Sequence, residues 1–393
     1  MMPSVGESGR TVRATPQVYH DLGVRVFINA AGTYTRLGGS RMAPAVVDAM
    51  AEAARCFVDV DDLQARAGDR IAALTRNDAA YVTSGAAAGL ILATAACMVG
   101  ADPARAWQLP ETPGLRTQIV VHRAHRNPYD YAVRTLPIHL IEIGFPNDIA
   151  PTQPWELDHV LGDQCAAVLY VAAAWTASGA LPLDDVVAIA HRKGVPVIVD
   201  AAAQLPPTEN LWRLTGLGAD LVIFSGGKDL RGPQASGLIV GRRDLIEACR
   251  LIGAPHHGIG RPFKVGKEEM IGLLAAVQVY LEHDDEARAR WAEGVVAALI
   301  DRLDGRGVRA RRSFPNEAGQ PLPRALVQFM GEDAGARRDR VVSYLRAGQP
   351  SVEVGVADVD GIYINPMTLE VGEEELLLPC LCTAVDAVAG DRR

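Results

Sequence analysis

The sequence has no apolar run long enough to cross a membrane and no excess of basic charge. Its longest apolar stretch, AAAGLILATAACMVG, is interrupted by glycine and is shorter than the ~20 residues of a membrane-spanning helix. Lysine and arginine number 39 against 47 acidic residues, a net charge of −8, whereas general nucleic-acid binders are basic. We therefore expect no membrane and no nucleic-acid partner. The segment RARRSF, which ends at Phe314, is either a local basic patch or, as we expect, a solvated surface loop.

Cysteine spacing typical of a metal site or of disulfides is also missing. The six cysteines are scattered, and only Cys380 and Cys382 are near neighbours. One C-x-C pair without a second pair is weak support for a metal site. The N-terminus lacks the apolar core of a secretion signal. We expect no metal, no disulfide framework and a cytoplasmic location, where thiols stay reduced.

Short β-branched runs alternate with longer alanine-rich stretches through most of the chain. Near-continuous apolar strands separated by helices are typical of a parallel sheet that helices cover on both faces. The pattern thus predicts an α/β fold with a mostly parallel sheet. The expected strands lie at 79–85, 118–123, 136–144, 165–175, 195–203, 219–227 and 235–243.

The length of 393 residues suggests two or three domains. Near residue 255 the pattern changes to a loop rich in glycine, proline and histidine, followed by a long helix from about Lys267 and strands at 324–329 and 361–367. We expect an N-terminal segment (1–45) that packs with a small domain. A large domain (46–258) would follow, and then an interface loop, a long helix and a small α+β C-terminal domain (259–393).

Three of the predicted strand ends carry residues with useful chemistry. Thr83, Ser84, Gly85 and Ala86 stand where a strand turns into a helix, so that free backbone N–H groups and the helix dipole could bind an anion. The same serine could be an ordinary helix cap. Asp200 closes an apolar strand and needs a partner, because an unpaired buried carboxylate is costly; either a salt bridge or a protonated ring nitrogen would serve.

Lys228 follows a third strand end, in the stretch FSGGKDLRGPQASG. Glycines on both sides of the lysine indicate that another group approaches the backbone closely. An anion loop, an acid and a lysine in this order fit pyridoxal 5'-phosphate. The loop, Ser84 and Ser225 would hold the phosphate, Asp200 would keep the ring nitrogen protonated, and Lys228 would form a Schiff base with the aldehyde.

The whole chain resembles the fold-type I pyridoxal phosphate enzymes, and within them the selenocysteine-synthase-like group. The motifs INAAGTYTRLGGS, YVTSGAAAG, HRAHRNPYDYAVR, VDAAAQLPP, FSGGKDLRGPQASG, GRPFKVGKEEMIGL and INPMTLEVGEEE carry this resemblance. It implies an aspartate-aminotransferase-like fold, in which a large domain with a seven-stranded type of sheet is joined to a smaller α+β domain. It also implies a homodimer or larger homo-oligomer whose subunits share active sites.

The resemblance further implies roles for individual residues. His125 would stack on the cofactor ring and act in catalysis, although Arg123 or Arg126 could take that place. Ala202 would pack under the ring. Gln204 would reach the ring hydroxyl or simply cap the strand end.

The chain also departs from its relatives. INAAG begins at residue 28, which leaves no room for an N-terminal tRNA-binding domain, so a tRNA substrate is not expected. The segment GIYINPMTLEVGEEE lacks the arginine that aminotransferases of this fold use for the substrate carboxylate. The candidates for holding the substrate anion are Arg36, Arg41, Arg123, Arg126, Arg261 and Lys264, the last two from a loop that could reach a neighbouring subunit or lie on an ordinary surface.

The function that follows is a pyridoxal phosphate-dependent lyase acting on a small amino acid or amino sugar acid. The substrate amine would displace Lys228, which would then act as the base at Cα; a β-substituent would leave, and a keto acid and ammonia would be released. A racemase, an aldolase or an aminotransferase of the same fold is the alternative. An inactive regulatory protein is the alternative from another class.

Overall fold

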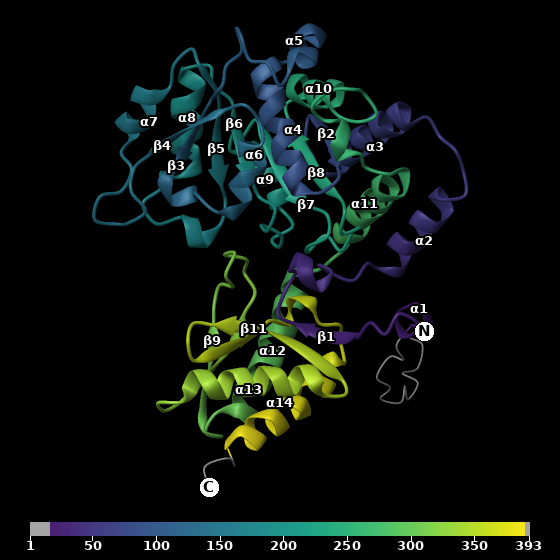
Figure 1. Cartoon of the computed structure of the whole chain (residues 1–393), viewed down its shortest axis with the longest axis vertical. Coiled ribbons are helices and arrows are strands. Elements are labelled where there is room, and N and C mark those ends of the chain that lie inside the picture. The colour runs from purple at the N-terminus through teal and green to yellow at the C-terminus, as the bar shows by residue number, and fades with distance from the viewer. Residues whose placement is uncertain (1–15, 390–393) are drawn as a thin grey trace. The chain divides into compact units, whose positions relative to one another are not determined.

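The computed structural model describes residues 16–389, and contacts divide the chain into two compact units. Of the described residues, the larger unit comprises 33–286 and 315–321, and the smaller comprises 16–32, 287–314 and 322–389. Each unit has its own sheet (Figure 1). The expected boundary at 258/259 differs from this division, because buried Met270, Leu273 and Val277 of α11 (Lys267–Tyr280) belong to the larger unit's core.

The larger unit is built on a seven-stranded sheet with the order β2-β8-β7-β6-β5-β3-β4. All neighbours are parallel except β8, which pairs antiparallel with both β2 and β7. This mostly parallel α/β sheet confirms the predicted fold class. The strands are β2 (Ala79–Thr83), β3 (Gln118–His122), β4 (His139–Ile143), β5 (Cys165–Val171), β6 (Val197–Asp200), β7 (Leu221–Ser225) and β8 (Gly237–Gly241).

Helices cover both faces of this sheet, as strands that are apolar on both sides require. On one face, buried residues of α4 (Ala86–Val99), α5 (Pro103–Gln108), α6 (Tyr131–Arg134) and α10 (Arg243–Ile252) form a core with Ile119, Ile198 and Ile223. The neighbouring strand residues Val120, Val199 and Phe224 belong to the core on the other face. The helices of that second core are α3 (Val60–Leu74), α7 (Pro154–Val160), α8 (Leu183–Arg192), α9 (Asn210–Gly216) and α11. The remaining helix, α2 (Pro44–Ala53), packs against α11.

The smaller unit has a five-stranded sheet in the order β1-β11-β12-β10-β9. β1 pairs parallel with β11, so the described end of the N-terminal segment extends this sheet, whereas residues 33–45 belong to the larger unit and 1–15 lie outside the described residues. The strands are β1 (Phe27–Ala30), β9 (Val308–Ser313), β10 (Arg324–Phe329), β11 (Ser351–Ala357) and β12 (Gly361–Ile364). The helices are α1 (Gln17–His20), α12 (Asp285–Leu303), α13 (Ala334–Ala347) and α14 (Glu373–Ala389).

The expectation that RARRSF is a surface loop was wrong. Its residues Arg309–Ser313 belong to β9, the edge strand that pairs antiparallel with β10. Buried Val308 and Ala310 alternate with exposed Arg309 and Arg311, and Arg312 pairs with Glu293. Charged side chains on an edge strand protect it from pairing with another chain, which explains the basic composition without a nucleic-acid partner. Across residues 16–389, no helix is long and apolar enough to cross a membrane.

Candidate active site

The predicted site residues of β2, β6 and β7 lie at the carboxyl edge of the larger sheet, where these three strands end. Gly237, at the start of β8, is in register with Thr83 on one side and with Ser225 on the other. Asp200, at the end of β6, is in register with Ile223 of β7 and with Val171 of β5. The carboxyl ends of parallel strands are the usual ligand site of an open α/β sheet, and the predicted residues converge there.

The turn after β2 leaves the first N–H groups of α4 without a side-chain cap. Its cap residue is Gly85, with φ 102° and ψ 161°, a conformation open almost only to glycine. The Thr83 hydroxyl donates to the Gly85 carbonyl at 2.8 Å. Gly237 lies so close that a Cβ there would stand 2.7 Å from the Ala86 nitrogen. Helix α4 is 14 residues long, and no side chain caps its first N–H groups. Such a helix start, with Gly237 packed closely beside it, can bind an anion such as a phosphate.

Ser84 ties this turn to the loop before α11. Its hydroxyl donates to the Phe263 carbonyl at 3.0 Å, so in this structure the hydroxyl proton serves the loop rather than a ligand. The bond brings the segment of Arg261 and Lys264 next to the α4 start, and both of these side chains are exposed. They remain candidates for an anion on the substrate or on the cofactor.

Lys228 stands on a turn that only glycine-rich sequence can form. A Cβ on Gly226 would lie 2.0 Å from the Ser236 hydroxyl, and one on Gly227 would lie 2.5 Å from the Gln234 Cα. Backbone bonds from Gly226 to Ser236 and from Arg231 to the Lys228 carbonyl close the turn. The glycines that flank the lysine are therefore explained by close backbone contact.

A second segment, residues 35–41, supports the same turn, a role that was not predicted from the sequence. The Ser40 hydroxyl lies 2.6 Å from the Lys228 carbonyl and 3.1 Å from the Gly227 carbonyl. The backbone N–H of Ser40 also donates to Gly227, at 3.1 Å. The Gln234 amide donates to the Thr35 carbonyl, at the short helix that carries exposed Arg36. The motif GGS was a signal for this contact, but its partner is almost 190 residues away in the chain.

Asp200 and Lys228 interact electrostatically. Burial lowers the pKa of Lys228, whereas Asp200 and Glu317 act in the opposite direction. Burial raises the pKa of Asp200, while the N–H of Ala202, 3.1 Å from Oδ1, and Lys228 both oppose that rise. A carboxyl group with only these partners can accept a further N–H donor, and a lysine with a lowered pKa is closer to the neutral amine that a base or nucleophile must be.

His125 is hydrogen-bonded to β5, the strand that pairs with β6 and its terminal Asp200. Its Nδ1 accepts the backbone N–H of Val171 at 3.2 Å, and its ring is edge-on to Tyr170 with centroids 4.5 Å apart. Burial, with His122 as a smaller cause, lowers the pKa of His125 to about 3. Because Nδ1 is an acceptor, the neutral ring carries its proton on Nε2, a buried atom without a hydrogen-bond partner in the structure. A neutral planar ring whose Nε2–H has no hydrogen-bond partner is suited to pack against a polar aromatic cofactor.

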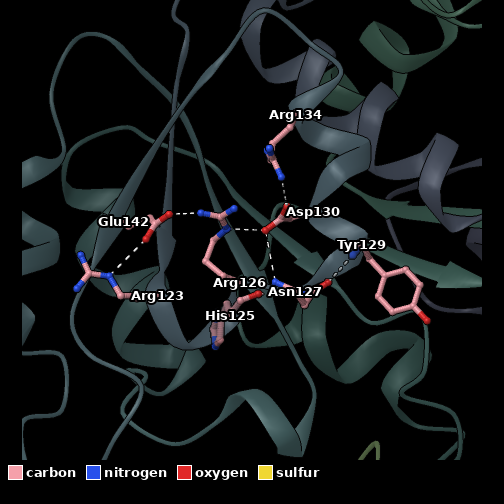
Figure 2. Close-up of polar contacts among 8 residues, drawn as sticks. All are labelled: Arg123, His125, Arg126, Asn127, Tyr129, Asp130, Arg134 and Glu142. Carbon is pink, nitrogen blue, oxygen red and sulfur yellow. Dashed lines mark hydrogen bonds and ion pairs between the residues drawn. The ribbon is translucent and has the colours of Figure 1, made fainter.

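The two arginines on either side of His125 lie in an ion-pair network. Arg126 pairs with Asp130 at 2.5 Å and with Glu142, and Arg123 pairs with Glu142 at 3.3 Å (Figure 2). Their charges are thus balanced by acids that belong to the same loop and to β4. They are weaker candidates for a substrate anion, and for the ring-stacking role, than the sequence suggested.

The remaining predicted residues occupy the loop after β6. Ala202 is partly buried and donates to Asp200, as described. The Gln204 amide nitrogen donates to the Ala318 carbonyl at 2.9 Å, so this end of the side chain holds a neighbouring loop. The backbone carbonyl of Arg41, another candidate for the substrate anion, accepts a hydrogen bond from the Arg231 guanidinium at 2.9 Å.

These features fit pyridoxal phosphate by their chemistry. The uncapped start of α4 suits a phosphate, the unpartnered Nε2 of His125 suits a polar ring, and the lysine with a lowered pKa suits an aldehyde. Among the described residues, no group of three or more histidine, cysteine, aspartate or glutamate side chains could hold a metal ion.

Comparison with known proteins identifies relatives along almost the whole chain. D-glucosaminate-6-phosphate ammonia lyase of Salmonella typhimurium is 33% identical over 371 residues, covering 93% of this chain and 96% of the relative. 5'-C-glycyluridine monooxygenase-decarboxylase of a Streptomyces species is 36% identical over 365 residues, with 91% and 86% covered. L-seryl-tRNA(Sec) selenium transferase of Moorella thermoacetica is 27% identical, with 98% and 87% covered. The family model described as L-seryl-tRNA selenium transferase matches residues 138–312.

Solved structures agree with these relatives. D-glucosaminate-6-phosphate ammonia-lyase superposes with a TM-score of 0.81 at 32% identity, covering 95% of this chain and all of that one. Serine palmitoyltransferase of Sphingomonas wittichii, at 13% identity and a TM-score of 0.59, shares the fold, with 92% and 88% covered.

Fold and relatives together define a fold-type I enzyme that depends on pyridoxal phosphate. Within that class, the chain belongs to the selenocysteine-synthase-like family that includes D-glucosaminate-6-phosphate ammonia lyase. The resemblance inferred from the sequence motifs is confirmed.

Proposed function

We propose that this protein is a pyridoxal phosphate-dependent lyase that releases ammonia and a keto acid from a small 2-amino-3-hydroxy acid, such as an amino sugar acid. The observation that carries the proposal is the convergence of Lys228, Asp200, His125 and the α4 start at one sheet edge. The ammonia lyase relative, similar over 93% of the chain, supports the choice of reaction.

Pyridoxal phosphate, when bound, supplies a ring that accepts electrons from a bond broken at Cα of the substrate. Asp200 would hold the proton on the ring nitrogen, the N–H groups at the start of α4 would hold the phosphate, and Lys228 would hold the aldehyde. With the substrate bound, the free amine of Lys228 would take the proton from Cα and could pass a proton to the departing 3-hydroxyl. One water leaves with the 3-hydroxyl and one water is consumed when the nitrogen is released, so the amino hydroxy acid becomes a 3-deoxy-2-keto acid and ammonia.

The substrate anion needs a cation that is not already balanced by acids. We propose Arg36, Arg261 and Lys264, because their segments contact the Lys228 turn or the α4 start and the side chains are exposed. We further propose a homodimer or larger homo-oligomer in which the loop of Arg261 and Lys264 contributes to a neighbour's site. A small amine rather than a tRNA is the proposed substrate, in keeping with the acidic net charge of −8. The cytoplasmic location stays a prediction.

A second reaction has specific support in the relative named 5'-C-glycyluridine monooxygenase-decarboxylase, at 36% identity. That name describes an oxygen-dependent loss of a carboxyl group, whereas ammonia elimination needs no oxygen. The two reactions therefore differ in a condition that is easily controlled.

The test is ammonia release by the cofactor-loaded protein, with and without oxygen. We expect ammonia and a keto acid from D-glucosaminate 6-phosphate or a related amino sugar acid, at equal rates in air and under argon. Oxygen-dependent carbon dioxide release from 5'-C-glycyluridine would replace the lyase by the second reaction. Racemisation, aldol cleavage or a requirement for an added keto acid would instead establish one of the alternatives from the sequence analysis. A protein that carries no cofactor and turns over no amine would point to a regulatory role.

A further inference from the structure

One face of helix α11 lies against the turn that carries Lys228. A Cβ at Gly272 of α11 would stand 2.7 Å from Cγ of Pro233, so the helix and the turn pack without space between them. A Cβ at Gly232 of the turn would likewise lie 3.2 Å from the Ala276 Cβ. Residues four positions apart share one face of a helix. The face that supports the lysine turn is therefore the one that contains Gly272 and Ala276.

The next residue on this face, Tyr280, makes a buried hydrogen bond to the turn. Its hydroxyl donates to Oδ2 of Asp229, the residue directly after Lys228, at 2.6 Å. Tyr280 is 0% exposed and Asp229 is 2% exposed, so water competes little for the bond. The distance is typical of a hydroxyl that donates to an ionised carboxylate, a bond about twice as strong as one between neutral groups. This contact ties the lysine turn to the last residue of α11.

A buried carboxylate is not the simplest way to stabilise a turn. Burial of a charge costs free energy that its partners must offset, and apolar side chains of similar size often give equal stability. Leu273 of the same helix already packs against the turn, where a Cβ at Gly226 would lie 2.8 Å from Leu273 Cδ1. A hydrogen bond adds a preferred length and direction to such packing. Because Asp229 is joined to Lys228 by one peptide bond, this contact restricts where the lysine side chain leaves the backbone.

We propose that Tyr280 is a positioning residue: through Asp229 it keeps the Lys228 amine aligned with the cofactor aldehyde and, once the amine is free, with Cα of the substrate. Misplacing a reacting group by about 1 Å can lower a rate about a hundredfold, so a bond one residue from the lysine can influence turnover. The step at Cα rests on the proposed lyase function. The attachment of the cofactor to Lys228 does not depend on which reaction follows, so the two claims can fail separately.

The first test measures cofactor attachment in the absence of substrate. The variant Tyr280→Phe removes the hydroxyl and keeps the ring. Its matched control is Tyr81→Phe, because Tyr81 is an equally buried tyrosine of the same unit that belongs to the core on the opposite face of the sheet. Absorbance after pyridoxal phosphate is added to the cofactor-free full chain gives the rate of attachment to Lys228.

We expect the rate of attachment to fall about tenfold in Tyr280→Phe and to stay within about twofold of the parent in Tyr81→Phe. The loss of a buried hydroxyl is common to both variants, whereas the contact with the lysine turn is made by Tyr280. A rate in Tyr280→Phe that is no slower than the rate in Tyr81→Phe would overturn the proposal.

The second test shows whether Tyr280 acts through Asp229. Asp229→Asn keeps an oxygen that can accept the Tyr280 hydroxyl, whereas Asp229→Ala removes the acceptor. We expect attachment in Asp229→Asn within about threefold of the parent and a loss in Asp229→Ala equal to that in Tyr280→Phe. Two residues that act through one contact have non-additive effects, so the double variant Tyr280→Phe/Asp229→Ala should be no slower than Asp229→Ala alone. Losses that multiply in the double variant would overturn the proposal; if Asp229→Ala does not fold, the comparison with Tyr81→Phe decides.

Turnover distinguishes this proposal from the lyase proposal. With D-glucosaminate 6-phosphate, we expect kcat in Tyr280→Phe to fall about tenfold while KM changes little, because other segments hold the substrate anion. If Tyr280→Phe attaches the cofactor slowly but the parent releases no ammonia from any amino hydroxy acid, the positioning role stands and the lyase function fails. If the parent releases ammonia and Tyr280→Phe attaches the cofactor and turns over at the parent rate, the lyase function stands and the positioning role fails.

Discussion

The tautomer of His125 is set by the backbone around it. The N–H of Val171 bonds to Nδ1 and the neighbouring Tyr170 ring lies edge-on, so the imidazole is buried, neutral and oriented. Burial lowers the pKa of His122 to about 4, and its Nε2 accepts a hydrogen bond from the Leu181 N–H. The two histidine rings lie 4.8 Å apart, and burial favours the neutral form of both. Neither ring therefore adds a positive charge beside Asp200 and Lys228.

The pH dependence of stability should show the burial of His125. Its pKa is about 3 in the folded protein against about 6.5 in an unfolded chain. Between these values the unfolded state binds more protons, so stability falls as the pH drops from about 6.5 towards 3. His125→Phe should therefore make the melting temperature less dependent on pH in this window. Replacing exposed His159 by asparagine should leave the slope as it is; an unchanged slope in His125→Phe would contradict the buried neutral ring.

The charge of Asp200 should matter more for turnover than for folding. Asp200→Asn keeps the size of the side chain, and its amide oxygen can still accept the Ala202 N–H. It cannot hold a proton on the ring nitrogen through a charge. We expect the cofactor still to attach to Lys228, a thermal midpoint within a few degrees of the parent, and a kcat lower by roughly a hundredfold or more. Full activity in this variant would show that the ring nitrogen has another partner.

At the scale of elements, the parts that the sequence predicted are those with strong local patterns. The buried strands of the larger sheet are apolar on both faces, and the expected ranges overlap all seven of them. β1, β9 and β11 were not predicted. β9 is an edge strand, and its exposed arginines obscure the alternation of apolar and polar residues that is typical of a strand. The four-residue strand β1 is defined by its pairing with β11, over 320 residues away. Long-range pairing leaves no local signal.

In the candidate site, too, the residues that follow a recognisable strand were predicted, and those that depend on long-range contacts were not. Lys228, Asp200 and the turn at Ser84 were found because each follows a recognisable strand. The supports of the lysine turn, Gly39 and Ser40, were missed. Their roles depend on contacts with residues almost 190 positions away in the chain. The acid partners of Arg123 and Arg126 were likewise not predictable, because Glu142 belongs to another strand.

Alanine substitutions at the two adjacent glycines before Ser40, Gly38 and Gly39, can be compared directly for their effect on stability. Both have positive φ, 87° at Gly38 and 72° at Gly39, so alanine is strained at either position. A Cβ on Gly39 would also lie 2.4 Å from the Gly227 carbonyl oxygen, whereas at Gly38 there is nothing within 4 Å. Gly38→Ala should cost about 1 kcal/mol of unfolding free energy, and Gly39→Ala clearly more, with weaker cofactor attachment at Lys228. Denaturant titration and absorbance measure both effects, and equal losses in the two variants would argue against the close approach of residues 35–41 to the lysine turn.

At the scale of the whole molecule, lysine is rare. The sequence contains 39 basic residues but only four lysines, Lys193, Lys228, Lys264 and Lys267. Lys193 pairs with Asp158, and Lys267 pairs with Glu268 and donates to the Ala53 carbonyl. Lys264 is exposed on its loop. Lys228 has a pKa that burial lowers, and it lies at the carboxyl edge of the sheet. A reagent that marks the cofactor-bearing lysine therefore has one expected target among four.

The most direct test of the account is borohydride reduction of the protein loaded with pyridoxal phosphate, followed by intact-mass and peptide mass spectrometry. Reduction fixes the cofactor to the amine that holds it. The account predicts one reduced pyridoxyl phosphate group per chain, located on the peptide of Lys228 and absent in Lys228→Ala, which should fold but show no turnover. A chain that gains no cofactor mass, or that carries it on Lys193, Lys264 or Lys267 instead, would contradict the assignment of this site.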